Sequence, residues 1–165
     1  MHELFAQAFP PRLRMVSNVL REFVEGSEEA HWSFRPANRG PSLIELVMDA
    51  LYTAHAFLNA IEKGRVSQGL ETRRIKGRPP ESKAALLAEF DMMVEMAEAA
   101  SQALSAEQLQ KPVEHPLGWT TSLENMLWFM RDHLLHHAGQ LSVYFRCLGL
   151  PEVEVADLVP MQAAR

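Results

Sequence analysis

The stretch DHLLHHAGQLSVYFRCLG, residues 132–149, decides the fold. It belongs to a longer segment in which apolar positions follow one another at alternating steps of four and three residues. Those positions are Leu123, Leu127, Met130, Leu134, His137, Leu141, Tyr144 and Leu148. This spacing predicts a helix over about residues 122–148 that packs one side against neighbouring helices. One member of the packed side is a histidine.

His133 precedes His137 by four residues, which places both imidazoles on nearly the same helix face. Their Cβ atoms are then about 5–6 Å apart, close enough for the two rings to bind one metal ion. A core histidine costs free energy unless its ring nitrogens have partners. The alternative to a metal is a pair of hydrogen-bonded packing histidines, and the spacing alone does not separate the two.

Three further helices are predicted over about residues 11–25, 42–62 and 82–104. Pro10 and Pro11 indicate that the first begins near them, and Gly26 can end it in a left-handed conformation. Ser42 and Glu45 form a capping box that begins the second, which Gly64 ends.

A second capping box, Thr121 with Glu124, is predicted to begin the last helix, and Gly149 ends it. Two long connections, 63–82 and 105–120, show no strong strand alternation. The chain is therefore predicted to be an all-α four-helix bundle with long connections. We expect a single domain over residues 1–165, with a C-terminal tail over 150–165.

Composition restricts the partners and the compartment. The net charge of −5 disfavours a nucleic-acid partner, and no apolar run approaches the roughly 18–20 residues of a membrane span. The basic residues Arg73, Arg74, Lys76 and Arg78 are interpreted as part of a solvated connector. The single cysteine, Cys147, is expected to be buried packing; with no internal disulfide, the chain is expected to be cytoplasmic.

A catalytic metal site needs a third protein ligand and an open position. The second helix offers Asp49 and His55, and the pattern of apolar residues does not choose between them.

The chain resembles the DinB-like superfamily of four-helix-bundle metalloenzymes. Its motifs are His133-Leu-Leu-His-His137-Ala-Gly139-Gln140-Leu141, Tyr144-Phe-Arg146-Cys-Leu148-Gly149-Leu-Pro151, Trp32-Ser-Phe-Arg35-Pro36 and Ser42-Leu-Ile-Glu45-Leu46-Val-Met-Asp49. Ala138 stands where the family usually has arginine. The resemblance implies one divalent metal, Zn²⁺ or Ni²⁺ with Fe²⁺ as an alternative, and homodimerisation.

In that family the second helix usually supplies a histidine seven residues after the capping residue, a position that Asp49 occupies here. Asp49 can ligate in its place, His55 can reach in through a shifted helix, or the site is weakened and catalysis is lost. We favour Asp49, His133 and His137 as the metal ligands.

The resemblance further implies chemistry on a small-molecule substrate with a low-molecular-weight thiol. Its characterised members include bacillithiol- and mycothiol-type thiol transferases and a thiol-dependent maleylpyruvate isomerase. We therefore expect a metal-dependent transferase or isomerase, with no catalytic residue assigned beyond the metal ligands. The competing hypothesis is a degenerate, non-catalytic bundle that acts as a binding or dimerisation module.

Overall fold

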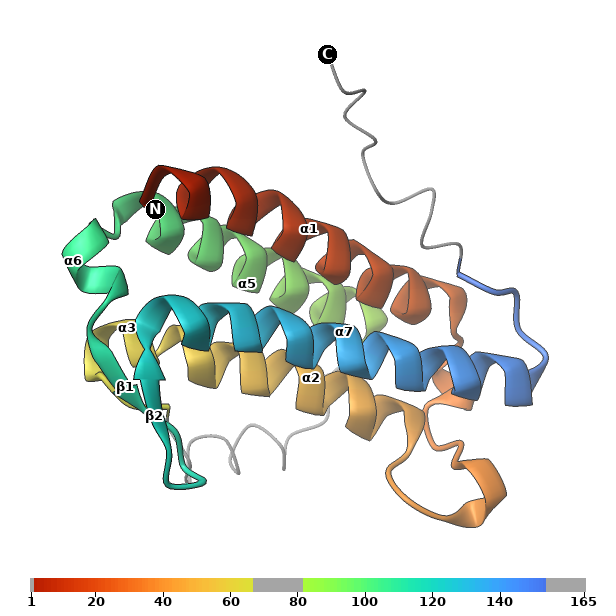
Figure 1. Ribbon diagram of the computed structural model, residues 1–165. Coiled ribbons are helices and arrows are strands. Elements are labelled where there is room, and N and C mark those ends of the chain that lie inside the picture. Colours follow the sequence, from red (N-terminus) through yellow and green to blue (C-terminus); the bar gives the residue numbers. More distant parts are fainter. Residues whose placement is uncertain (1, 67–81, 154–165) are drawn as a thin grey trace.

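The computed structural model describes residues 2–66 and 82–153. Four long helices form a bundle (Figure 1), which confirms the predicted all-α class: α1 His2–Gly26, α2 Leu43–Leu58, α5 Lys83–Ala103 and α7 Leu123–Leu148. The shorter elements are the 3-10 turns η1 Glu29–His31 and η2 Pro36–Asn38, the helices α3 Ala60–Lys63 and α6 Ala106–Leu109, and the strands β1 Pro112–Glu114 and β2 Thr120–Ser122.

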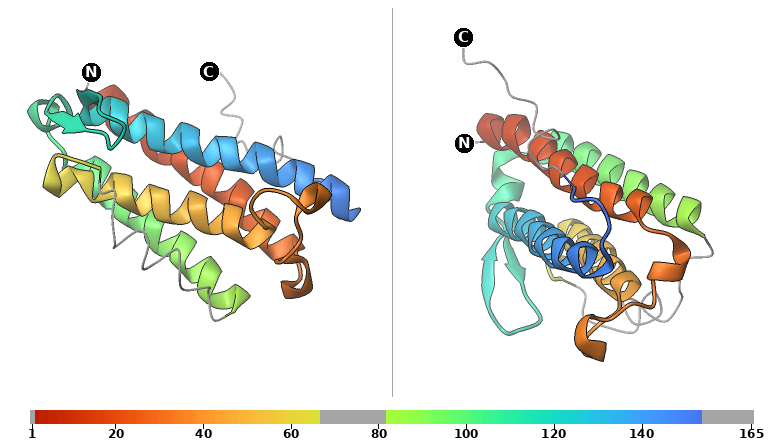
Figure 2. Two further views of the ribbon diagram at one scale, coloured as in Figure 1. Left: turned by 90° about the horizontal axis from the view of Figure 1, so that it is seen from below. Right: turned by 90° about the vertical axis from the view of Figure 1, so that its right-hand side faces the viewer.

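The helix directions distinguish this bundle from a simple up-and-down one. In Figure 1, α1 and α7 run from left to right, whereas α2 and α5 run from right to left. Thus α2 packs antiparallel to α7, and α5 packs antiparallel to α1. Because α2 and α5 run the same way, the end of α2 and the start of α5 lie at opposite ends of the bundle. The connection from α1 to α2 and the β1–β2 hairpin lie at opposite ends (Figure 2).

The predicted start of the second helix is confirmed. The Ser42 hydroxyl accepts a hydrogen bond from the Glu45 backbone N–H at 3.3 Å, and the Glu45 carboxylate accepts one from the Ser42 N–H at 2.6 Å. The predicted single helix over 42–62 is interrupted, however, since α2 ends at Leu58 and α3 follows after Asn59. Gly64, with φ of 64°, ends α3 in the left-handed conformation as predicted.

The first helix differs from the prediction at both ends. It begins at His2 and continues through Pro10 and Pro11, although prolines remove backbone donors. Phe5 and Phe9 supply the reason: both are buried, stack on each other at 4.9 Å and contact the edge of Trp128. Packing against α7 therefore outweighs the local preference for a helix start at the prolines.

Gly26 has a different role from the one predicted for it. It is absent from the positive-φ glycines, so it does not end α1 in a left-handed conformation. A Cβ atom placed on it would lie 3.3 Å from the Phe145 ring. The residue is small because α1 and α7 approach each other closely at this point.

The connection to α7 contains structure that the sequence did not predict. Strands β1 and β2 pair antiparallel, with Val113 opposite Thr121. Because Thr121 belongs to the hairpin, the predicted Thr121–Glu124 capping box is wrong. Ser122 caps α7 instead, and its hydroxyl accepts a hydrogen bond from the Asn125 N–H at 3.3 Å. Gly149, with φ of 69°, ends α7 as predicted.

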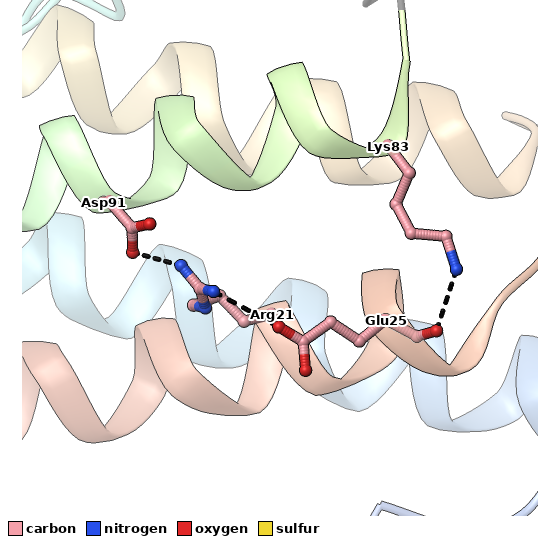
Figure 3. Close-up of polar contacts among 4 residues, drawn as sticks. All are labelled: Arg21, Glu25, Lys83 and Asp91. Atoms are coloured by element: carbon pink, nitrogen blue, oxygen red, sulfur yellow. Dashed lines mark hydrogen bonds and ion pairs between the residues drawn. The ribbon is translucent and has the colours of Figure 1, made fainter.

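The buried apolar side chains of the four long helices form one cluster. Charged contacts join α1 to α5 at the surface (Figure 3), where Arg21 pairs with Asp91 and Glu25, and the Lys83 ammonium donates to the Glu25 carbonyl at 2.9 Å. Ion pairs this exposed contribute little to stability. Burial of the apolar cluster is therefore the main force that holds the bundle together.

Some predictions concern residues outside the described ranges. These are the basic residues Arg73, Arg74, Lys76 and Arg78, and the part of the tail after Val153. Among the described helices, we find none with the length and apolarity to cross a membrane.

The N-terminal extension of α1 gives a stability prediction. Phe9→Ala should lower the free energy of unfolding by about 3–5 kcal/mol, because it removes a fully buried ring. Leu4→Ala, on the same helix at 68% exposure, is the control and should change it by less than about 0.5 kcal/mol. Urea unfolding measures both variants. A similar small loss for the two would mean that the first turns of α1 do not belong to the cooperative core.

Candidate metal centre

Three of the residues singled out in the sequence meet between α2 and α7. His133 and His137 come from successive turns of α7, and Asp49 comes from the facing turns of α2. The Nε2 atom of His137 lies 3.1 Å from Nε2 of His133 and 3.4 Å from Oδ2 of Asp49. One ligand atom from each of the three residues lies within 4.8 Å of the other two.

These separations are close to those of a metal site. Ligand atoms about 2.1 Å from a cation are roughly 3.0 Å apart at a right angle and roughly 3.4 Å apart at the tetrahedral angle. Two of the three pairs already lie in this range. The ligand atoms of the third pair, Asp49 and His133, are no more than 4.8 Å apart. Two imidazoles and one carboxylate are a suitable donor set for Zn²⁺, Ni²⁺ or Fe²⁺.

Burial keeps His133 in the protonation state that a metal requires. It is the main cause that lowers the pKa of His133 to about 4; the neighbouring His137 lowers it further, and Asp49 opposes the shift. His133 is therefore neutral at pH 7, with a nitrogen lone pair available. His137 is only 4% exposed, and its Nδ1 atom has no hydrogen-bond partner in the described part of the chain.

The other histidines considered in the sequence lie elsewhere. His55 faces α5, where its Nε2 atom lies 3.8 Å from the Glu89 carboxylate, and burial lowers its pKa. His136 is exposed, with its ring centroid 5.5 Å from that of His137, and does not belong to the group of converging ligand atoms. Cys147 is exposed, so the expectation that it is buried packing is wrong.

An aromatic wall that sequence reasoning missed stands beside His133. It consists of Phe57 from α2, Phe129 from α7, and His115 and Trp119 from the hairpin region. The rings of His115 and Trp119 stack with their centroids 4.2 Å apart, and the ring centroid of Phe57 lies 6.4 Å from that of His133. The wall explains part of the desolvation of His133. In the connection over residues 105–120, only His115 and Trp119 gave any sequence signal of this wall.

Asp49 borders a cavity of about 780 Å³. The cavity lies between α2 and the connection that precedes it, and its lining includes Trp32, Arg35 and Met48. Small-molecule sites in proteins have volumes of about 300–1,000 Å³. One of the three converging side chains, Asp49, thus lines a space large enough for a small molecule.

Comparison with known proteins gives a family match over most of the chain. The model of the DinB superfamily matches residues 12–141. The uncharacterized protein YjoA of Bacillus subtilis (strain 168) is 28% identical over 138 residues, which are 82% of this chain and 86% of that protein. The crystal structure of this DinB-like protein superposes with a TM-score of 0.70 at 26% identity, over 88% of this chain and 95% of that one.

Two more distant structures share the fold. YfiT from Bacillus subtilis, described as a probable metal-dependent hydrolase with an unusual four-helix bundle topology, is 15% identical with a TM-score of 0.73, over 88% of this chain and 89% of that one. The mycothiol-dependent maleylpyruvate isomerase is 16% identical with a TM-score of 0.68. That likeness covers 85% of this chain but only 62% of the isomerase.

The lowered pKa of His133 predicts how the metal-free protein responds to acid. Between pH of about 4 and about 6.5 the unfolded chain binds a proton at this histidine that the folded chain does not. The free energy of unfolding should therefore rise with pH across this window, by at most about 1.4 kcal/mol per pH unit from this group. His133→Gln should remove that part of the rise, as measured by urea unfolding in EDTA at several pH values. Parallel curves for the variant and the parent protein would contradict the assignment.

Proposed function

Because this chain belongs to the DinB superfamily, we propose that it is a metalloenzyme that acts on small molecules, with one divalent cation held by Asp49, His133 and His137. The observation that supports the proposal most strongly is the convergence of these three side chains within 4.8 Å from two different helices. A cation bound there acts as a Lewis acid and lowers the pKa of a coordinated water or thiol.

Charge favours an anionic fourth ligand. Two neutral imidazoles and one carboxylate leave one net positive charge on a divalent cation. His133 stays neutral at physiological pH because its pKa is about 4. The partly buried site screens that charge less than bulk water would. A thiolate or a hydroxide therefore suits the remaining position.

Each protein ligand has a separate role in this proposal. His137, which is almost fully buried, holds the cation at the base of the seam between α2 and α7. His133 stands between this position and the aromatic wall, which excludes water from one side. Asp49 supplies the negative charge and faces the cavity, so a substrate reaches the open position from the Asp49 side.

We propose a transferase or isomerase reaction that uses a low-molecular-weight thiol. The mycothiol-dependent maleylpyruvate isomerase, which shares the fold, gives this reaction class its support. Zn²⁺ or Ni²⁺ suits the donor set, with Fe²⁺ as the alternative. We also propose that the protein is a cytoplasmic homodimer, and light scattering that gives the mass of one chain at working concentration would rule out the dimer.

Metal uptake tests the proposal directly. Protein purified without a histidine tag should bind one Zn²⁺ or Ni²⁺ per chain, and a hundredfold excess of metal over its Kd should stabilise it by about 2.7 kcal/mol. His137→Leu should abolish uptake, measured by elemental analysis and by thermal unfolding. It should leave the metal-free protein as stable or more stable, because a buried Nδ1 atom without a partner is removed.

Two matched variants make the test specific. His136→Gln changes an exposed histidine beside the site and should retain full uptake. His55→Gln tests the alternative third ligand and should also retain it, whereas Asp49→Asn should weaken binding. If His137→Leu left metal content unchanged, or if no metal stabilised the parent protein, the non-catalytic module would become the better explanation.

A further inference from the structure

The two histidines of the candidate metal centre differ in what surrounds their second ring nitrogen. The His133 ring makes a hydrogen bond with the Asp49 backbone, in addition to the contact between its Nε2 atom and that of His137. The Nδ1 atom of His137 is buried and has no hydrogen-bond partner among the described residues. Metal-binding histidines almost always donate their other ring N–H to an acceptor, which fixes the orientation of the ring. The contacts already formed supply no such acceptor for His137.

The contact between the two rings shows why His137 needs an acceptor. Its Nε2 atom lies 3.1 Å from Nε2 of His133, the length of a hydrogen bond, so one of these atoms carries a proton and the other accepts it. A cation held by both rings requires the lone pairs of both Nε2 atoms. A neutral imidazole then carries its hydrogen on Nδ1. With metal bound, His137 therefore has a buried Nδ1–H donor, which costs free energy if it stays unpaired.

Gln140 carries a buried acceptor that also lacks a partner. The side chain is half-buried, but its Oε1 atom is buried and makes no hydrogen bond within the described ranges. Gln140 follows His137 by three residues on α7, so the two side chains are neighbours with Cβ atoms about 5–6 Å apart. An amide oxygen accepts up to two hydrogen bonds. One proton between the glutamine and the imidazole would satisfy both buried atoms.

Ser17 is the other residue with a buried side-chain oxygen that lacks a partner in the part of the chain described. It lies on α1, three residues after Arg14 and four before Arg21, both of which form ion pairs with α5. This spacing turns Ser17 toward α5, whereas His137 faces α2. Gln140 is therefore the acceptor that suits the His137 ring.

We propose that Gln140 is a positioning residue of the metal centre, whose Oε1 atom accepts a hydrogen bond from the Nδ1–H group of His137 when His137 binds the cation through Nε2. The hydrogen bond fixes the orientation of the His137 ring. This inference rests on the proposed function, because it concerns the metal-loaded protein. Gln140 acts through His137 and is not itself a ligand.

A neutral amide suits this position better than a carboxylate. Asp49 already supplies the one negative charge of the donor set, which leaves one net positive charge on a divalent cation for a fourth ligand. The oxygen of Gln140 orients His137 without adding a second negative charge. A carboxylate in its place would strengthen the hydrogen bond and reduce that positive charge.

The affinity for Zn²⁺ measures the contribution of this hydrogen bond. Gln140→Met keeps the length of the side chain but removes the acceptor, and it should weaken Zn²⁺ binding by about 10–100-fold in a competition titration with a chelator. Gln140→Glu keeps an acceptor in place and should bind Zn²⁺ at least as tightly as the parent protein. Gln102→Met makes the same change at an exposed position of α5, and this control should bind like the parent protein.

Stability in EDTA separates a positioning role from a structural one. Without metal, Gln140→Met should unfold at the same urea concentration as the parent protein or at a higher one, because the variant removes a buried acceptor that has no partner. A loss of stability in EDTA large enough to account for the weaker Zn²⁺ binding would indicate a structural role and would contradict the proposal.

NMR of the Zn²⁺-loaded protein with ¹⁵N-labelled histidine detects the hydrogen bond itself. The Nδ1–H proton of His137, assigned through couplings within the ring, should exchange slowly with solvent and lie at low field. Gln140→Met should move this signal upfield and leave the Nδ1–H signal of His133 in place. An unmoved His137 signal, or a Kd for Zn²⁺ within about twofold of the parent value, would overturn the proposal.

The outcome for the parent protein separates this inference from the proposed function. If the parent protein takes up no Zn²⁺, the proposed function fails and the role of Gln140 fails with it. If the parent protein binds Zn²⁺ and Gln140→Met binds it equally tightly, the metal centre stands and only the role of Gln140 is removed.

Discussion

The register of α2 against α7 is the constraint on which the candidate site depends. A slip of one helical turn moves a side chain by about 5.4 Å. This shift exceeds the 3.4 Å between Asp49 Oδ2 and His137 Nε2, so it would separate the two ligands. Two features fix the register near its ends. The Tyr144 hydroxyl donates a hydrogen bond to the Pro41 carbonyl just before α2. Toward the other end of α2, the ring centroids of Phe57 and Phe129 are 5.6 Å apart. The site lies between these two contacts.

Local chemistry explains which parts of the fold could be predicted from the sequence. The start of α2 is set by Ser42 and Glu45, which are three residues apart, and the end of α7 by one glycine, so short-range patterns sufficed. The start of α1 required knowledge of Trp128, more than a hundred residues away in the chain. The hairpin was missed because each strand has three residues, too few for an alternating pattern. That hairpin also moved the α7 cap from Thr121 to Ser122.

The same contrast between short-range patterns and long-range contacts applies to the candidate site. The pairing of His133 with His137 is a matter of spacing within one helix, and the sequence was sufficient to propose it. The choice between Asp49 and His55 depended on which face of α2 meets α7, and only the packed structure turns His55 toward Glu89 instead. The cavity with Trp32 and Arg35 had no spacing pattern at all, because its walls come from an irregular connection and from the surface of a helix.

The place of α7 as the last of the four long helices also bears on how the protein folds during its synthesis. A ribosome releases α1, α2 and α5 before α7, so the faces of α1 and α2 that pack on α7 stay uncovered until this helix emerges. Contacts between α1 and α7 join parts of the chain that are far apart in sequence, which slows folding relative to a bundle of sequential neighbours. Until α7 emerges, the nascent chain therefore exposes apolar surface to which a chaperone can bind.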